Sequence, residues 1–170
     1  ENPDGDSLGS AIALDYLLSD FEISLYCPVD VPKYLRYFAD WSRVSNEFDF
    51  KADGYIIVDT AAEVLLSKLL DDTAIKNRLY AAPVLVIDHH ETGRSTIKDA
   101  TLIIDPKVSS TCEMIANLIE YYDVEIESYY ATILLSGIVL DTNNYTLNTT
   151  AETYYLSYYL SSLGASAKKV

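Results

Sequence analysis

Hydrophobic residues follow two alternating patterns along the chain. Short runs rich in Val, Ile and Leu are typical of buried strands and predict strands at Glu22–Cys27, Tyr55–Val58, Val84–Ile87 and Thr101–Ile104. Longer stretches with apolar residues at helical spacing predict helices at Ser7–Ser19, Val31–Ala39, Ala61–Leu70, Ser110–Tyr122, Ser128–Leu140 and Ala151–Leu163. Strands that alternate with helices indicate an α/β fold, here a doubly wound, mostly parallel sheet with helices on both faces.

Polar residues that could bind a metal ion or take part in catalysis gather where these apolar runs end. The only two histidines, His89 and His90, follow Asp88 at the end of a predicted strand. Three further acidic positions are comparable, each beside the end of an apolar run or in a glycine-containing loop before one: Asp4 with Asp6, Asp59 and Asp141. Because ligands of open α/β sheets bind outside the carboxyl ends of the strands, we expect these residues to line one edge, with Asp141 approaching from a run that is also predicted as helix.

Length and composition narrow the class of protein. The 170 residues, 49% of them hydrophobic, suffice for one substantial core, so we expect a single domain. No apolar run approaches the roughly 20 residues of a membrane helix and no secretory signal opens the sequence, so we expect a soluble, cytoplasmic protein with no membrane partner. Cys27 and Cys112 have neither metal-binding nor disulfide-scaffold spacing, which favours two reduced, buried thiols.

The charge balance restricts the substrate. A formal net charge of -14 argues against a broad nucleic-acid surface, because duplex binding relies on Lys and Arg at the phosphates. A phosphate-ester substrate would need bound divalent cations to neutralise it, and clustered carboxylates supply the ligands for such ions. The 15 tyrosines are open to two interpretations, helix faces packed on the core or on a neighbouring domain, and platforms for base stacking.

Asp and His together suit Mn²⁺ or Mg²⁺, and several carboxylates around two ions about 3.5–4 Å apart are typical of phosphoryl hydrolysis. Asp59 is our candidate for the bridge between the two ions. Neighbours on an extended segment point to opposite sides, so we expect one imidazole to bind metal and the other to meet substrate, with Asp88 accepting a ring proton of a ligating histidine. Ser110 and Thr111 precede an apolar helix and serve either as its N-cap or as a phosphate site.

Four segments in this order resemble the dispersed motifs of the DHH phosphoesterase superfamily: residues 2–6, 58–60, 88–90 and 137–142. The resemblance implies that two divalent ions, Mn²⁺ first and Mg²⁺ or Co²⁺ as alternatives, are held by Asp4, Asp6, Asp59, His89 and Asp141. It also implies that His90 contacts the scissile phosphate and assists the leaving group. We count Asp88, the expected partner of the ligating histidine, with the catalytic residues. Ser110 and Thr111 are then expected on the substrate oxygens.

Within this superfamily, residues 109–113 and 148–153 are most similar to the branch of nanoRNases and phosphoadenosine-phosphate phosphatases. The resemblance therefore implies a manganese-dependent phosphoesterase acting on short single-stranded RNA or a related small nucleotide. The alternatives are a cyclic-di-AMP phosphodiesterase, an inorganic pyrophosphatase or exopolyphosphatase, and a nucleotide-binding module without turnover.

The sequence departs from the family pattern at two positions. The histidine that opens the family's first motif would fall one position ahead of Glu1, and Gly93 stands where many relatives carry a polar residue. We expect residues 1–170 to be the DHH catalytic domain truncated at its N-terminus, with the family's C-terminal substrate-binding domain as its partner in the full-length chain and a homodimer as a candidate assembly.

Overall fold

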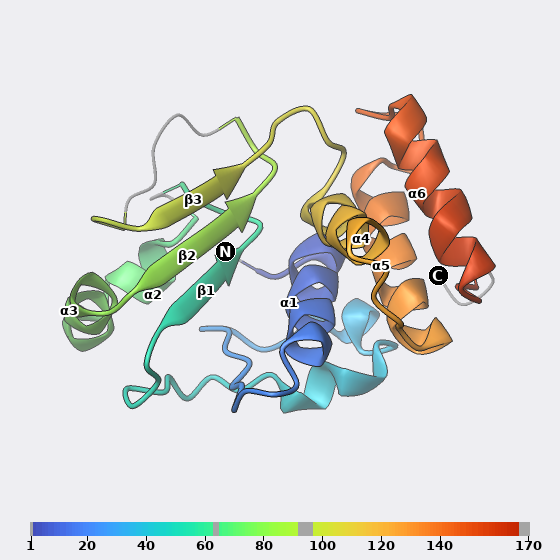
Figure 1. Ribbon diagram of the computed structural model, residues 1–170. Helices are drawn as coiled ribbons and strands as arrows, with labels where there is room; N and C mark the ends of the chain where they lie inside the picture. Colours follow the sequence, from blue (N-terminus) through green and yellow to red (C-terminus); the bar gives the residue numbers. More distant parts are fainter. Residues whose placement is uncertain (1, 63–64, 92–96, 167–170) are drawn as a thin grey trace. The chain divides into compact units, whose positions relative to one another are not determined.

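The computed structural model describes residues 2–62, 65–91 and 97–166 (Figure 1). The backbone divides into two compact units, whereas the sequence predicted one core. The first, called here the sheet unit, contains residues 24–106 with the first three residues, and the second, called the helical unit, contains residues 4–23 and 107–170.

Three parallel strands form the sheet unit. They are β1 (Tyr55–Val58), β2 (Val84–Asp88) and β3 (Thr101–Ile104), in the spatial order β1-β2-β3. The register pairs Ile57 with Val86, and Ile87 with Ile103. All three strands were predicted, and their parallel pairing confirms the α/β class.

One face of this sheet packs against two helices, α2 (Ser67–Leu70) and α3 (Thr73–Ala81). Val84 and Val86 alternate onto that face and form a core with α2 and α3 residues, among them Leu69, Ile75 and Leu79. The sequence did not predict α3, because its only buried apolar residues are a single i, i+4 pair. The available signal was Asp72, whose side chain accepts hydrogen bonds from the backbone N–H groups of residues 74 and 75.

Three predicted elements of the sheet unit differ from the structure. Glu22–Cys27 is not a strand: Tyr26 forms only an isolated bridge with Ser45, and Pro28, with no N–H to donate, follows directly. The expected helix over 31–39 is replaced by two 3-10 turns, η1 (Lys33–Leu35) and η2 (Ala39–Arg43). Of the helix expected over 61–70, only α2 forms within the described residues.

Four helices make up the described part of the helical unit: α1 (Gly5–Leu17), α4 (Thr111–Tyr121), α5 (Ser128–Asp141) and α6 (Ala151–Ser162). All four were predicted to within about a turn. Helix α5 packs against α1, α4 and α6, which explains why it is apolar around its whole circumference. Asp141 therefore ends a buried helix, and the strand-like interpretation of the run before it is wrong.

The tyrosines serve more than one purpose. Tyr16 and Tyr130 stack between α1 and α5 with ring centroids 4.0 Å apart, as expected for packed helix faces. Others, including Tyr121, Tyr154 and Tyr158, are exposed on the helical unit. Among the residues that the structure describes, no helix combines the length and the apolar character needed to cross a membrane.

Both cysteines are free thiols, as predicted. Cys112 is fully buried in the helical unit, and Cys27 is partly buried in the sheet unit. Burial raises the pKa of the Cys27 thiol, which keeps it protonated and a poor nucleophile at neutral pH.

Candidate metal centre

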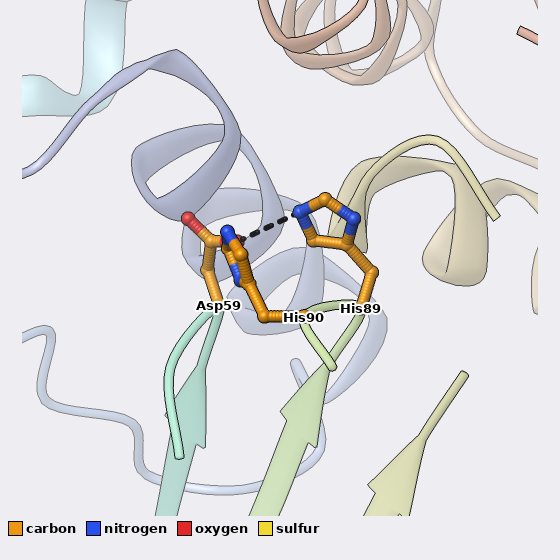
Figure 2. A group of neighbouring side chains, drawn as sticks. All are labelled: Asp59, His89 and His90. Atoms are coloured by element: carbon orange, nitrogen blue, oxygen red, sulfur yellow. Dashed lines mark ion pairs between the residues drawn. The ribbon is translucent and has the colours of Figure 1, made fainter. Parts of the chain in front are cut away.

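Asp59, His89 and His90 form a compact cluster at the carboxyl edge of the sheet (Figure 2). Asp59 follows β1 and the histidines follow β2, and the register places the ends of these strands side by side. Oδ1 of Asp59 lies 3.7 Å from Nε2 of His89 and 3.8 Å from Nδ1 of His90. The potential ligand atoms of the three side chains all lie within 4.8 Å of one another. Parallel pairing thus brings together residues that are 30 positions apart in the chain.

Asp59 has an unusual backbone conformation. Its φ is 63°, in the left-handed region, while its N–H still donates to the carbonyl of Ile87 at 2.8 Å. Aspartate accepts this conformation better than most residues, yet it costs free energy and is found disproportionately at functional sites. The turn ends β1 abruptly and leaves the nearly buried carboxylate beside the histidines.

Asp88 is fully buried and holds His90. Its Oδ1 accepts a hydrogen bond from the His90 backbone N–H at 3.0 Å and lies 2.8 Å from the ring Nδ1. A carboxylate at Nδ1 favours the tautomer with the proton on that nitrogen and leaves the lone pair on Nε2. We expected Asp88 to pair with the metal-ligating histidine, His89, whereas the contact that the structure describes is with the other ring, that of His90.

The two histidines do not point to opposite sides, and that expectation is wrong. Their ring centroids are 4.2 Å apart, because the strand ends at Asp88 and the alternation of an extended segment does not continue. They differ instead in exposure: the side chain of His89 is 7% exposed and that of His90 is 47% exposed. His89 is therefore the buried candidate for binding metal, and His90 is accessible to a substrate.

The donor types in this cluster fit a divalent metal ion. A buried carboxylate and an imidazole combine a hard oxygen with a borderline nitrogen, a set that suits Mn²⁺ and its neighbours in the first transition series. Burial of Asp59 and His89 also removes competing water from the ligand atoms. The residues present therefore fit the metal that the sequence predicts.

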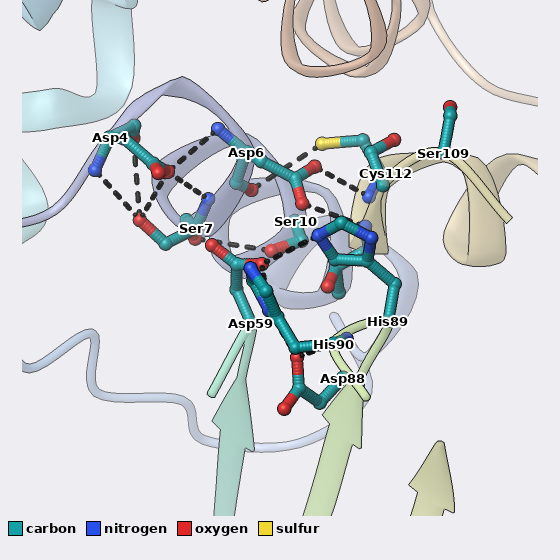
Figure 3. Close-up of polar contacts among 12 residues, drawn as sticks. Asp4, Asp6, Ser7, Ser10, Asp59, Asp88, His89, His90, Ser109 and Cys112 are labelled. Atoms are coloured by element: carbon teal, nitrogen blue, oxygen red, sulfur yellow. Dashed lines mark hydrogen bonds and ion pairs between the residues drawn. The ribbon is translucent and has the colours of Figure 1, made fainter. Parts of the chain in front are cut away.

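In the helical unit, Asp4 is the N-cap of α1 (Figure 3). Its Oδ1 accepts from the backbone N–H groups of Asp6 and Ser7 at 3.1 and 2.9 Å and from the Ser7 hydroxyl at 2.9 Å. Oδ1 is therefore in use as the cap of the helix. Every hydrogen bond found for this carboxylate among the described residues falls on Oδ1, which leaves Oδ2 on the solvent-exposed side chain available to a ligand.

Asp6, two residues further on, is buried, and both of its carboxylate oxygens accept hydrogen bonds from α4. Its Oδ2 accepts from the N–H of Thr111 and its Oδ1 from the N–H of Cys112, both at 2.7 Å (Figure 3). These are the first two amides of α4, where unpaired N–H groups and the helix dipole favour an anion. The N-terminus of α4 therefore binds a carboxylate of the same chain.

Ser110 and Thr111 lie in this arrangement as buried residues. The Ser110 hydroxyl caps α4 by accepting from the N–H of Glu113 at 3.0 Å, which confirms the N-cap interpretation. The amide of Thr111 donates to Asp6, and neither side chain is exposed. Their contacts support a positioning role more directly than contact with a phosphate.

Glu113 belongs to a buried polar cluster that sequence reasoning missed. Its Oε2 accepts from the Ser109 N–H at 3.0 Å, from the Ser109 hydroxyl and from the Thr153 hydroxyl at 2.9 Å. The carboxylate thereby ties the start of α4 to the first turn of α6. The sequence signal was the spacing of Ser110 and Glu113, which matches the capping-box pattern, although Glu113 accepts from Ser109 and not from the N-cap amide.

Asp141, the last residue of α5, is half-buried and is followed by strained backbone. Asn143, Asn144 and Tyr145 have φ values of 46°, 55° and 61°, three consecutive residues in the left-handed region. The Thr142 hydroxyl stabilises this turn by accepting from the Tyr145 N–H at 3.0 Å. The adjacent asparagines were the available signal, because asparagine tolerates this region. Such strain is typical of functional segments.

The profile of the DHH family, N-terminal domain, matches residues 1–138. The chain belongs to the DHH family. The predicted resemblance is thus confirmed, and Asp88, His89 and His90 are the triplet from which the DHH family takes its name. Gly93, which departs from the family pattern, lies outside the described residues.

Several proteins resemble this DHH domain. It is 41% identical over 115 residues to the cyclic-di-AMP phosphodiesterase PdeA of Listeria monocytogenes, a match that covers 65% of this chain and 16% of that protein. It is 30% identical over 156 residues to the bifunctional oligoribonuclease and PAP phosphatase NrnA of Thermus thermophilus, covering 89% and 44%. An exopolyphosphatase-related protein from Bacteroides fragilis has a similar structure, with a TM-score of 0.84, 25% identity and coverage of 98% and 52%. The chain spans less than half the length of these two curated relatives.

Proposed function

We propose that this DHH domain is the catalytic part of a divalent-metal-dependent phosphoesterase that hydrolyses phosphodiester bonds in small nucleotides. The observation that carries the proposal is the cluster of Asp59, His89 and His90 at the carboxyl edge of the sheet, with a buried carboxylate holding the exposed imidazole. Membership of the DHH family supports the same class of reaction.

The proposal assigns Asp59 and His89 as metal ligands in the sheet unit, with Asp59 bridging two ions. In the helical unit, it assigns Asp4, Asp6 and Asp141. Mn²⁺ is the favoured ion, with Mg²⁺ and Co²⁺ as alternatives, because the set is rich in carboxylates and includes one imidazole. When bound, such ions lower the pKa of a water molecule and neutralise the charge of the phosphate. The net charge of -14 makes this neutralisation necessary for an anionic substrate.

His90 is the proposed proton donor to the leaving oxygen. Its ring is half exposed, so it is able to reach a substrate, and its Nδ1 is held by Asp88. That contact fixes the ring orientation and leaves Nε2 as the nitrogen that faces a substrate and delivers the proton. Asp88 is thus a positioning residue for His90. Ser110 and Thr111 act in this scheme by fixing α4 and Asp6, the role that their described hydrogen bonds support.

Two substrates compete. The identity of 41% with PdeA favours cyclic-di-AMP, which was a predicted alternative. The longer match to NrnA, over 156 residues, favours short oligoribonucleotides or phosphoadenosine phosphate. We place cyclic-di-AMP first because the identity is higher over the segment that contains the DHH triplet and its neighbours. In either case we propose that a further substrate-binding domain acts with these residues, since PdeA and NrnA are much longer.

The test is Mn²⁺-dependent hydrolysis of cyclic-di-AMP and of a diribonucleotide by the full natural chain. Asp59→Asn removes a proposed ligand, and His90→Gln removes the proposed acid. Asp99→Asn is a matched control, because Asp99 also lies in the sheet unit with φ near that of Asp59, at 60°, but is exposed and outside the cluster. We expect turnover to be lost in the first two variants and retained in the control. Metal-loaded wild type that hydrolyses neither substrate would contradict the proposal.

A further inference from the structure

A buried cysteine in the helical unit lies between two glycines on neighbouring helices. A methyl group at Gly137 of α5 would lie 2.3 Å from Sγ of Cys112 and 2.9 Å from its Cβ. A methyl group at Gly9 of α1 would lie 3.0 Å from the same sulfur. The sulfur thus has little room on either side. At Gly137 the first turn of α4 approaches α5 more closely than a side chain would permit without a shift, and at Gly9 the approach is tight.

This close approach is directly connected to Asp6. The methyl group at Gly137 would also lie 3.2 Å from Oδ1 of Asp6, the oxygen that accepts the Cys112 N–H at 2.7 Å. The other oxygen accepts the Thr111 N–H at the same distance. With a donor on each oxygen, the carboxylate is unable to rotate about its own axis without breaking a charge-assisted hydrogen bond. The orientation of the carboxylate is therefore fixed.

We propose that Gly137 is a positioning residue for the metal ligand Asp6. Because Gly137 has no side chain, the first turn of α4 lies close enough to α5 for two amides to hold the carboxylate. Cys112 is the side chain that packs against Gly137 at this contact. The inference rests on the proposed function, because Asp6 is a ligand only within it. A side chain at 137 displaces Cys112, Cys112 carries its amide with it, and Asp6 turns away from its binding direction.

Two variants test this mechanism at different points. Gly137→Ala introduces the methyl group. Thr111→Pro removes one of the two N–H donors and places a ring atom against the Asp6 oxygen, while proline at the first helical position preserves α4. Ser110 before it is already extended, with φ -165° and ψ 160°, as a residue preceding proline requires. The double variant Gly137→Ala with Cys112→Gly removes the atoms that the new methyl group would meet at 2.3 and 2.9 Å.

The readout is Mn²⁺ binding to the full natural chain by isothermal titration calorimetry. We expect the affinity of one ion to fall roughly 10- to 100-fold in Gly137→Ala and in Thr111→Pro, as for other groups that orient a ligand. The double variant should recover most of the loss. Leu160→Ala is the stability control. Leu160 is fully buried on α6, and none of the described hydrogen bonds to Asp6 comes from it.

The outcomes separate the two proposals. Wild-type affinity in both Gly137→Ala and Thr111→Pro would overturn the positioning role and leave the proposed function intact. An equal loss in Leu160→Ala at a matched melting temperature would also overturn it, because reduced stability would then explain the effect. Wild type that binds no Mn²⁺ would overturn the proposed function and the positioning role together. If Gly137→Ala fails to fold, Thr111→Pro alone decides the matter.

Discussion

Oδ1 of Asp88 lies 2.8 Å from Nδ1 of His90, two positions further along the chain. The carboxylate is fully buried and the imidazole is half exposed, so the pair joins the interior of the sheet unit to its surface. An imidazole held in this way has one orientation and a fixed tautomer before substrate arrives. Most of what His90 does in the proposed reaction depends on this contact.

Asp88→Asn should therefore lower kcat by roughly 10- to 100-fold while changing KM little. The amide is nearly the same size but no longer presents a carboxylate oxygen to Nδ1, so the tautomer of the ring is not fixed although the ring stays in place. Steady-state kinetics of the full natural chain measure both constants. Combining Asp88→Asn with His90→Gln should add little to the effect of His90→Gln alone, because both act through one ring. Additive losses would show that Asp88 acts independently.

The backbone conformation of Asp59 predicts that glycine gives a more stable protein than alanine at this position, the reverse of the usual order. Its left-handed φ of 63° is free of strain for glycine and costs about 1–2 kcal/mol for alanine. Asp59→Gly should therefore be more stable than Asp59→Ala by about 1 kcal/mol, although both lose the proposed ligand. Urea unfolding without metal measures the difference. The same pair at Asp99, exposed with φ 60°, gives the backbone effect alone. An alanine variant as stable as the glycine variant would show that the backbone relaxes at this position.

Glu113 should be one of the most sensitive polar positions for stability. Glu113→Ala removes the acceptor of three hydrogen bonds and leaves the buried Ser109 N–H and two hydroxyls to find other partners. We expect a loss of about 3 kcal/mol in the free energy of unfolding, measured with urea. Glu120→Ala is the control, since its hydrogen bond to Tyr155 is exposed. A comparably small change in both would mean that the buried cluster reorganises around the missing carboxylate.

The sequence predicted the regular elements well where local signals and packing agree. The strands β1, β2 and β3 are short β-branched runs, and α4 and α6 begin at hydroxyl caps, so their positions follow from local chemistry. Prediction failed at 22–27, where an apolar run finds only one bridge partner, and at α3, where two apolar residues suffice because β2 supplies the rest of the core. Such outcomes depend on contacts distant in sequence.

The candidate site shows the same division. That Asp59 lies beside the histidines followed from the parallel edge, and their cluster was predicted. That His89 and His90 lie on the same side was not, because it depends on where β2 ends. The two hydrogen bonds from α4 to Asp6 join residues that are 105 and 106 positions apart in the chain. No local sequence pattern indicates them. The sequence thus identified the chemical groups, while their orientation required the tertiary structure.

Metal binding should also stabilise the fold. An ion that binds only the native state adds about 2.7 kcal/mol at a concentration 100 times its dissociation constant. Mn²⁺ should therefore raise the melting temperature of the full natural chain, and Asp59→Asn should abolish the shift. Asp99→Asn should retain it, because Asp99 is exposed and outside the cluster. Differential scanning calorimetry at several Mn²⁺ concentrations measures the effect, and Ca²⁺, which prefers more oxygen ligands, should produce a smaller shift at equal concentration. An equal shift in wild type and Asp59→Asn would place the stabilising ion away from Asp59.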